Sequence, residues 1–303
     1  MYREHSRDEK ENLMYGMDRK PTWFDYVLVA IFILILVITL YPFLNVVAIS
    51  FNDSLDTIRN INFIIPREFT LQNYRYVFQD SALVSATLTS IARTVIGSFI
   101  SVFATAMLAY TLSRKDYFLR RFLTVAFVIT MYVGGGMIPD YLLIIRTLKL
   151  GNNFLVYLLP GLIWVYNMIL VRSYIDGLPD ALEEAATLDG ANDLQIFFQI
   201  IFPLCAPVIA TVTLFYAVGQ WNSFMDTYLY AKKLPTLQYK LYEIMSQATM
   251  KIDAHNNADV KATVTPMSIR MAVTVVATVP ILIVYPFVQK YFVGGMTLGA
   301  VKS

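Results

Sequence analysis

Residues 178–191 read Leu-Pro-Asp-Ala-Leu-Glu-Glu-Ala-Ala-Thr-Leu-Asp-Gly-Ala and separate two strongly apolar runs. Pro179 followed by Asp180 is a helix-start signal, because proline fits the first turn and a carboxylate fits the positive helix end. Gly190 suits the left-handed conformation that ends a helix. The stretch therefore predicts a helix of about three turns over residues 180–189.

A second short helix is expected directly after the first. Asn192 or Asp193 can cap its start, and Pro203 marks the step into the next apolar run. Its apolar residues recur at helical spacing along one stripe, namely Leu194, Phe197, Phe198 and Ile201. The whole segment is therefore predicted to be a helix-turn-helix.

This segment is also acidic. Residues 173–203 contain no basic residue but six carboxylates, namely Asp176, Asp180, Glu183, Glu184, Asp189 and Asp193. Helices that rest on lipid usually carry Lys and Arg, and acids beside anionic lipid are unfavourable. Two interpretations are open, an amphipathic connector at the lipid interface or a docking element for a partner with a basic cleft, and the charges favour docking. Ala181, Ala185 and Leu188 share one helix face, which a partner surface can approach closely.

The composition is that of a membrane protein. The chain has 303 residues, of which 57% are hydrophobic and 15% charged, whereas soluble domains carry about 25% charged residues. A helix needs roughly 20 apolar residues to cross a bilayer, and six segments qualify, at 26–49, 83–112, 122–145, 154–174, 204–224 and 271–292. We therefore predict an all-α membrane protein with six transmembrane helices. The glycines at 134–136 and Pro139 break the third span, either as a hinge near a pathway or as a close helix contact.

Other classes of site find no support in the composition. The net charge of +2 gives no reason to expect nucleic acid. Cys205 is the single cysteine and is interpreted as a packing residue, and no Cys or His cluster has metal-ligand spacing. About 25 mostly polar residues precede the first apolar run, which is longer than that of a signal peptide, so it is expected to remain as an anchor.

Lysine and arginine near the ends of the spans indicate the orientation of the chain. The amino-terminal head is basic, and the short loop between the second and third spans carries Arg114, Lys115, Arg120 and Arg121. Both are predicted to be cytoplasmic, and with six spans both termini are then inside. Lysines in 227–268 oppose this, but a longer loop counts for less. The predicted regions are a cytoplasmic head (1–25), a transmembrane domain (26–293) with a cytoplasmic loop (175–203) and outer segments (50–81 and 227–268), and a cytoplasmic tail (294–303).

Glu184-Ala185-Ala186, Gly190, Ile200 and Pro203 resemble the EAA loop of binding-protein-dependent ABC importer permeases. That loop reads E-A-A, three residues, G, nine residues, I, one residue, L-P. Phe202 stands where leucine is usual and keeps the position apolar. The resemblance implies the type I ABC importer permease fold, in which this loop is a cytoplasmic coupling helix.

Four further stretches extend the resemblance over nearly the whole chain. Residues 66–74 (PREFTLQNY) and 220–224 (QWNSF) resemble carbohydrate permeases of the maltose MalG type. Residues 134–139 (GGGMIP) and 285–292 (YPFVQKYF) resemble most closely a subgroup that imports oligosaccharides of the aldouronate and alginate kind. The resemblance therefore implies an oligosaccharide importer, with acidic sugars as the nearest match, in a bacterial inner membrane.

The resemblance also implies partners: a second homologous permease, two ATPase subunits, an extracytoplasmic solute-binding protein, the oligosaccharide and membrane lipid. ATP and Mg²⁺ would be bound by the ATPases, since this chain has no G-x-x-x-x-G-K-[ST] loop, and it would be no enzyme and hold no cofactor. The positions expected to contact the ATPase are Glu183, Glu184, Ala185, Ala186, Leu188 and Gly190. The tail, with Gly295 and Gly299, is a candidate second contact. Alternating access would couple the loop to the spans.

Candidates for the sugar pathway combine aromatic faces with hydrogen-bonding groups. They are Gln220, Trp221 and Asn222 at the end of the fifth span, and Tyr166 and Asn167 in the fourth. The alternative role for such residues is hydrogen bonding between helices. Arg93, inside the second span, either attracts an acidic sugar or is structural, bonded to carbonyls or to an acid of the partner permease.

Other functions remain as alternatives. A secondary transporter would need coupling carboxylates within the spans, and none lies clearly at mid-membrane. A membrane enzyme would need a catalytic constellation, and we find none in the sequence. A permease for amino acids or metal ions would carry a similar EAA loop, but residues 69–74 and 220–224 favour sugar.

Overall fold

The computed structural model describes residues 22–60, 64–79, 81–254 and 264–300. These residues form helices and no strand, with a single isolated bridge between Asn52 and Phe69. Three helices are long and apolar enough to cross a membrane: α2 (Trp23–Ser50), α5 (Ala82–Ser113) and the part of α15 (Pro266–Ala300) up to Ile283. They match the first, second and sixth predicted spans.

Two bent pairs of helices account for two more predicted spans. The first pair is α6 (Arg120–Tyr132) with α7 (Met137–Leu142) and η1 (Leu143–Thr147), bent by 114°. The second is residues 193–204 with α12 (Ala206–Asn222), bent by 82°. If each bent pair is one span, the described residues contain up to five candidate membrane spans.

The fourth predicted span is not a continuous helix. Residues 154–174 divide into the 3-10 turn η2 (Phe154–Tyr157) and the short helix α8 (Val165–Ile175). Pro160 and Gly161 lie in the break, where proline removes a backbone donor and glycine disfavours the helix. Six helical spans are therefore not seen in the described residues, although the polypeptide has the apolar length for them.

The predicted break in the third span is confirmed at the three glycines. Helix α6 ends at Tyr132, and Gly136 has φ +86°, a conformation that an L side chain rarely adopts. A Cβ on Gly134 or Gly136 would meet no heavy atom within 4 Å. These two glycines therefore permit a turn, and no close helix contact within the described residues requires them.

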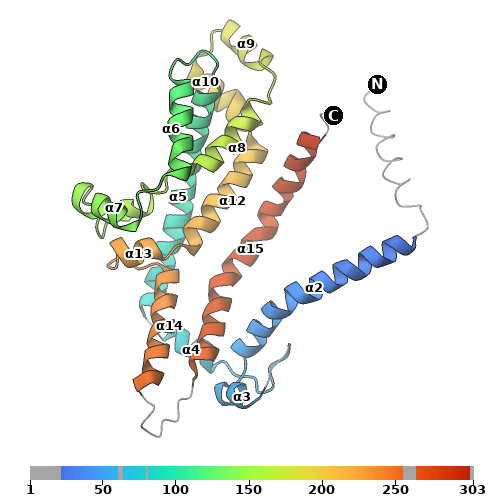
Figure 1. The fold of residues 1–303 in the computed structure, drawn as a ribbon, viewed down its shortest axis with the longest axis vertical. Helices are drawn as coiled ribbons and strands as arrows, with labels where there is room; N and C mark the ends of the chain where they lie inside the picture. The colour runs from blue at the N-terminus through green and yellow to red at the C-terminus, as the bar shows by residue number, and fades with distance from the viewer. Residues whose placement is uncertain (1–21, 61–63, 80, 255–263, 301–303) are drawn as a thin grey trace.

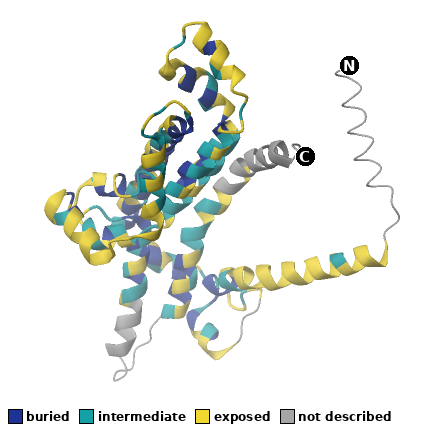
Figure 2. Cartoon of the chain, turned by 45° about the horizontal axis from the view of Figure 1, so that its top comes forward, coloured by how far each residue is buried: buried dark blue, intermediate teal, exposed yellow. Residues whose placement is uncertain are grey.

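Figure 1 shows α5, α6, α8, α12 and α15 side by side, with α9 (Ala181–Leu188) and α10 (Asp193–Ile196) at one end of the molecule. The other end holds α3 (Ser54–Arg59), α4 (Gln72–Phe78) and α14 (Leu237–Ala254). The largest core lies between α5, α8, α12 and the segment after α10, and it includes Val102, Ala106, Met168, Val171, Ile201, Val212 and Tyr216. Helix α2 projects away from this bundle, and Figure 2 shows it exposed along almost its full length. Only Ala48, Ile49 and Ser50 of α2 are buried.

The motif at residues 66–74 organises the segment after α2. The buried Asn73 donates to the backbone oxygens of Ser50 and Asn52 at 2.9 and 3.0 Å. Asn52 in turn accepts from the backbone N–H groups of Arg67 and Glu68 at 2.8 and 2.9 Å. Because buried amides require partners, these two asparagines fix the turn that brings α3 and α4 against the end of α2.

Candidate functional site

The acidic segment forms the predicted helical hairpin, with a first helix shorter than expected. Helix α9 begins directly after Asp180 and spans two turns rather than three, ending at Leu188. Gly190 has φ +85°, which confirms its predicted left-handed role. Asn192 caps α10: its side chain accepts from the backbone N–H of Gln195, and the Gln195 side chain accepts from the backbone N–H of Asn192, both at 2.9 Å.

The hairpin has one packed face and one open face. Of the predicted ATPase contacts, Ala186 is 8% exposed and turns into the core, whereas Leu188 is 88% exposed. Glu184 and Ala185 are also exposed. Glu183 is half-buried and faces the loop that follows α5. The open face of α9 therefore presents a carboxylate, an alanine and a leucine.

The second half of the hairpin packs against α5 through aromatic side chains. After α10 the chain continues as the π-helical η3 (Phe197–Ile201) and the short α11 (Phe202–Leu204). The ring of Phe197 lies 5.5 Å from that of Tyr110, and the rings of Phe103 and Phe198 stack at the same separation. Phe197 and Phe198 of the predicted apolar stripe thus contact α5, and Ile201 is buried, whereas Leu194 is 59% exposed.

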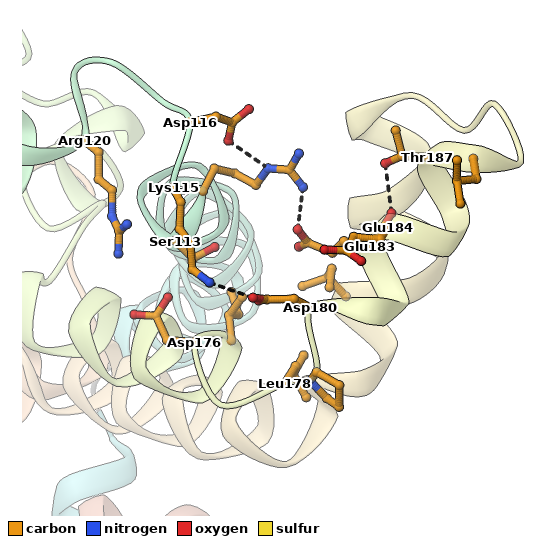
Figure 3. Close-up of a pocket in the computed structure, with 15 residues that line it drawn as sticks. Ser113, Lys115, Asp116, Arg120, Asp176, Leu178, Asp180, Glu183, Glu184 and Thr187 are labelled. Atoms are coloured by element: carbon orange, nitrogen blue, oxygen red, sulfur yellow. Dashed lines mark hydrogen bonds and ion pairs between the residues drawn. The ribbon is translucent and has the colours of Figure 1, made fainter.

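Ion pairs tie the first half of the hairpin to the loop after α5 (Figure 3). The Arg114 guanidinium donates to Glu183 at 2.5 Å and lies 3.7 Å from Asp193, while Lys115 donates to Asp180 at 2.6 Å. A groove of about 790 Å³ lies between this loop and α9. Much of the acidity of the segment is therefore balanced by the basic loop of the same chain, a partner that the sequence interpretation did not consider.

The pKa values of the two basic side chains reflect these contacts. Burial acts to lower the pKa of Arg114, but the nearby Glu183, Asp116 and Asp193 carboxylates and Tyr110 raise it, so that it lies above its ordinary value. The hydrogen bond to Asp180 raises the pKa of Lys115. Both side chains thus carry their charge throughout the physiological pH range.

A second polar cluster lies along the amino-terminal half of α5. Arg93 is 2% exposed, and its two Nη atoms donate to the carboxylate of Asp226 at 3.1 and 2.5 Å. Gln220 accepts from Arg93 Nε at 3.0 Å and donates to the backbone oxygen of Tyr157 at 3.0 Å. The guanidinium also lies 4.4 Å from the centre of the Tyr157 ring. Arg93 thus has a bidentate acidic partner within its own chain, whereas the sequence interpretation had considered an acidic sugar, backbone carbonyls or an acid of the partner permease.

The remaining pathway candidates differ in their exposure and in their hydrogen bonds. Trp221 donates to the backbone oxygen of Ala277 on α15 at 3.1 Å. Asn222 is exposed, and Tyr166 is 56% exposed. Asn167 is 1% exposed, and neither end of its amide has a hydrogen-bond partner in the described residues.

Gly295 and Gly299, in the tail, belong to the backbone of α15, which runs to Ala300. The helix thus extends into the predicted tail (294–303) as far as Ala300. The surroundings of these glycines lie outside the described residues.

The sequence interpretation missed the pairing of Arg93 with Asp226 and the pairing role of Arg114. Arg93 within an apolar span was a signal for a buried acid, and Asp226 lies just beyond the fifth span. Arg114 was noted only for its effect on orientation. Its position one residue after α5, opposite an acidic hairpin, could not be inferred without the fold.

Residues 95–298 match a family described as "Binding-protein-dependent transport system inner membrane component". The chain is 38% identical to the polygalacturonan/rhamnogalacturonan transport system permease protein YtcP of Bacillus subtilis, over 94% of this chain and 100% of that protein. It is 30% identical to the arabinooligosaccharides transport system permease protein AraQ of Halalkalibacterium halodurans, over 90% and 94%.

A solved structure is also similar. It is the crystal structure of a bacterial ABC transporter involved in the import of the acidic polysaccharide alginate, with a TM-score of 0.75 and 28% identity, covering 90% of this chain and 99% of the other. These findings confirm the resemblance drawn from the EAA loop. The chain belongs to the inner-membrane components of binding-protein-dependent transport systems, the non-catalytic, multi-pass permease subunits of ABC transporters.

Proposed function

We propose that this chain forms half of the translocation pathway of an ATP-driven importer of acidic oligosaccharides. The relatives at 38% and 30% identity are named for polysaccharide or oligosaccharide transport, and the similar solved transporter is described as importing an acidic polysaccharide. The observation that carries the ATP-driven part of the proposal is the hairpin, which is anchored on one face and open on the other. Fragments of the alginate or aldouronate kind are the proposed cargo.

The open face of α9 is the proposed ATPase contact. Glu184, Ala185 and Leu188 would enter a cleft of the ATPase, since they are exposed and none of their side chains belongs to an ion pair or hydrogen bond among the described residues. Ala186 and Glu183 would not contact the ATPase but would hold α9 in place on the packed face of the hairpin. The ATPase subunits would bind ATP and Mg²⁺, and a second permease and a solute-binding protein would complete the machine.

The proposed topology has six spans with both termini and the hairpin in the cytoplasm. The ion pairs between the loop after α5 and α9 support it, because groups in contact lie on the same side of a membrane. Residues 154–174 would supply the fourth span as η2 and α8 together. Residues 50–81 and 227–268 would lie outside, and residues 294–303 would make a second ATPase contact.

Asn222, Trp221 and Tyr166 are the proposed pathway residues of this chain, because Asn222 and Tyr166 are exposed and Trp221 is half-buried. Gln220 and Arg93 would support them, since their polar atoms are already occupied by other side chains and backbone. Asn167 remains a candidate because a substrate or water could satisfy its unpaired amide.

Reconstituted transport tests the proposal. The complex of both permeases, the ATPases and the binding protein would be placed in liposomes and supplied with alginate, galacturonate or neutral oligosaccharides of equal length. We expect acidic sugars to give the largest uptake and the largest stimulation of ATP hydrolysis. Stimulation by an amino acid or a metal ion, with none by any sugar, would contradict the proposed cargo.

A further inference from the structure

Arg114 lies where the long helix α5 meets the coupling hairpin. It is the residue directly after α5, and it faces Glu183 in the first turn of α9 and Asp193 in the first turn of α10. We propose that Arg114 and Glu183 form a clamp that makes α5 move together with α9, so that α5 carries the movement of the ATPase across the membrane. The inference rests on the proposed coupling function and names the helix that receives the movement.

Apart from its ion pairs, helix α9 makes little buried contact with the helical bundle. Ala186 is its single buried residue, and Gly190 adjoins it with a positive φ. The covalent connections lead to α8 on one side and to α10 on the other. Without the clamp, α9 would be held laterally by little apolar contact, and its movement would reach α5 only indirectly.

The Arg114 pair is better suited to this task than its neighbour. The Arg114 and Glu183 side chains are each 25% exposed, whereas Lys115 and Asp180 are 75% and 71% exposed. Exposed pairs are screened by water and salt and contribute little, while partly buried pairs are screened less. The guanidinium also lies 5.8 Å from the Tyr110 ring centre, which restrains it further. We therefore assign the mechanical link to Arg114.

Helix α5 can transmit such a movement over a long distance. Its 32 residues contain no proline and form one continuous helix, about 48 Å long at 1.5 Å per residue. Phe103 and Tyr110 attach its carboxyl-terminal half to η3. Arg93 attaches its amino-terminal half to Asp226, which lies on α13 (Met225–Tyr230). Helix α5 thus connects the hairpin to the polar cluster around Arg93.

Charge reversal tests the clamp. Arg114→Glu and Glu183→Arg, each alone, are expected to lower sugar uptake per ATP hydrolysed by about tenfold, within the roughly 5- to 150-fold range of coupling between sites. The exchange Arg114→Glu with Glu183→Arg is expected to restore most of the uptake. Arg121→Glu is the matched control, because it changes the charge of the same region equally and Arg121 makes no ion pair in the described residues.

Several results would overturn the clamp. Normal sugar uptake in the single variants would do so. So would a double variant whose uptake is no higher than that of either single variant. Loss of the ATPase from the single variants during purification would assign the pair to docking instead. A different result would contradict the proposed function itself: a wild-type complex that transports no sugar or binds no ATPase.

A cross-link gives a second, positive readout. Arg114→Cys with Glu183→Cys removes both charges, and uptake should fall as in the single reversals. A short bismaleimide should then restore uptake by joining the two helices, because the clamp stays closed throughout the cycle. The native Cys205 is 1% exposed and does not compete for the reagent. Cross-linking that leaves uptake low would mean that α5 and α9 separate during transport.

Discussion

At the scale of single residues, the polar side chains within the apolar helices are explained by their partners. A buried charge is costly unless it is paired and hydrogen-bonded. Arg93 satisfies that condition with Asp226 and Gln220, and the Gln220 amide nitrogen donates to the backbone oxygen of Tyr157. Gly97 completes the cluster, because its missing side chain makes room for the Gln220 amide.

Gly97→Ala tests this packing. A Cβ at Gly97 would lie 2.9 Å from Gln220 Nε2, and the amide cannot retreat without breaking its bonds to Arg93 and Tyr157. Alanine favours a helix over glycine by about 1 kcal/mol, but overpacking together with lost buried hydrogen bonds costs about 2–4 kcal/mol. We expect a net loss of about 1–3 kcal/mol in the free energy of unfolding, measured by titration with SDS.

Gly134→Ala is the matched control for that measurement. A Cβ there would meet nothing within 4 Å, so unfolding should be unchanged. If the two variants unfold alike, the cluster does not depend on the space at Gly97.

At the scale of elements, the hairpin is built from local signals. Asn192 with Gln195 caps α10, and Gly190 provides the left-handed turn before it. These signals act within a few residues, which is why the sequence predicted them. The π-helical turns η1 and η3 were not predicted, because their bonding pattern has no comparable local signature.

Gly190→Pro and Glu184→Lys test the hairpin as the ATPase contact. Proline fixes φ near −65° and cannot take the value of +85°, and lysine reverses the charge on the open face. Both variants should lose the ATPase during affinity purification yet remain inserted in the membrane. Gly190→Ala is the control: it meets no steric contact and costs about 1–2 kcal/mol, so the ATPase should be retained. Normal retention in the proline and lysine variants would refute the contact.

At the scale of the whole molecule, the burial pattern separates packed from unpartnered surfaces. Helices α5, α8 and α12 share the main core, while α2 buries only its last three residues. Apolar side chains exposed in this way suit a lipid or protein environment rather than water. The hairpin and the loop after α5 form one end of the molecule, opposite α3, α4 and α14 (Figure 1).

Cysteine labelling tests the sidedness of these two ends. Phe118→Cys and Leu188→Cys occupy sites that are 85% and 88% exposed in this chain. In permease prepared without the ATPase, which would cover Leu188, both should react with an impermeant maleimide only in inside-out vesicles. Glu68→Cys, also exposed, should react only in right-side-out vesicles. The wild-type chain is the control, since Cys205 is buried. Labelling of residues 68 and 188 from one side would contradict the six-span topology.

The sequence by itself determined the membrane class, the long helices α2, α5 and α15, the break at Gly136 and the caps of the hairpin. Each depends on apolar length or on backbone preferences that act within a few residues. The tertiary structure alone decided how charges are paired: Arg93 with Asp226, 133 positions away, and Arg114 with Glu183, 69 positions away. The division of residues 154–174, by contrast, follows a local signal, Pro160 and Gly161, that the count of apolar residues did not weigh. The charge pairings follow from which helices pack together, and hydrophobic periodicity does not specify that choice.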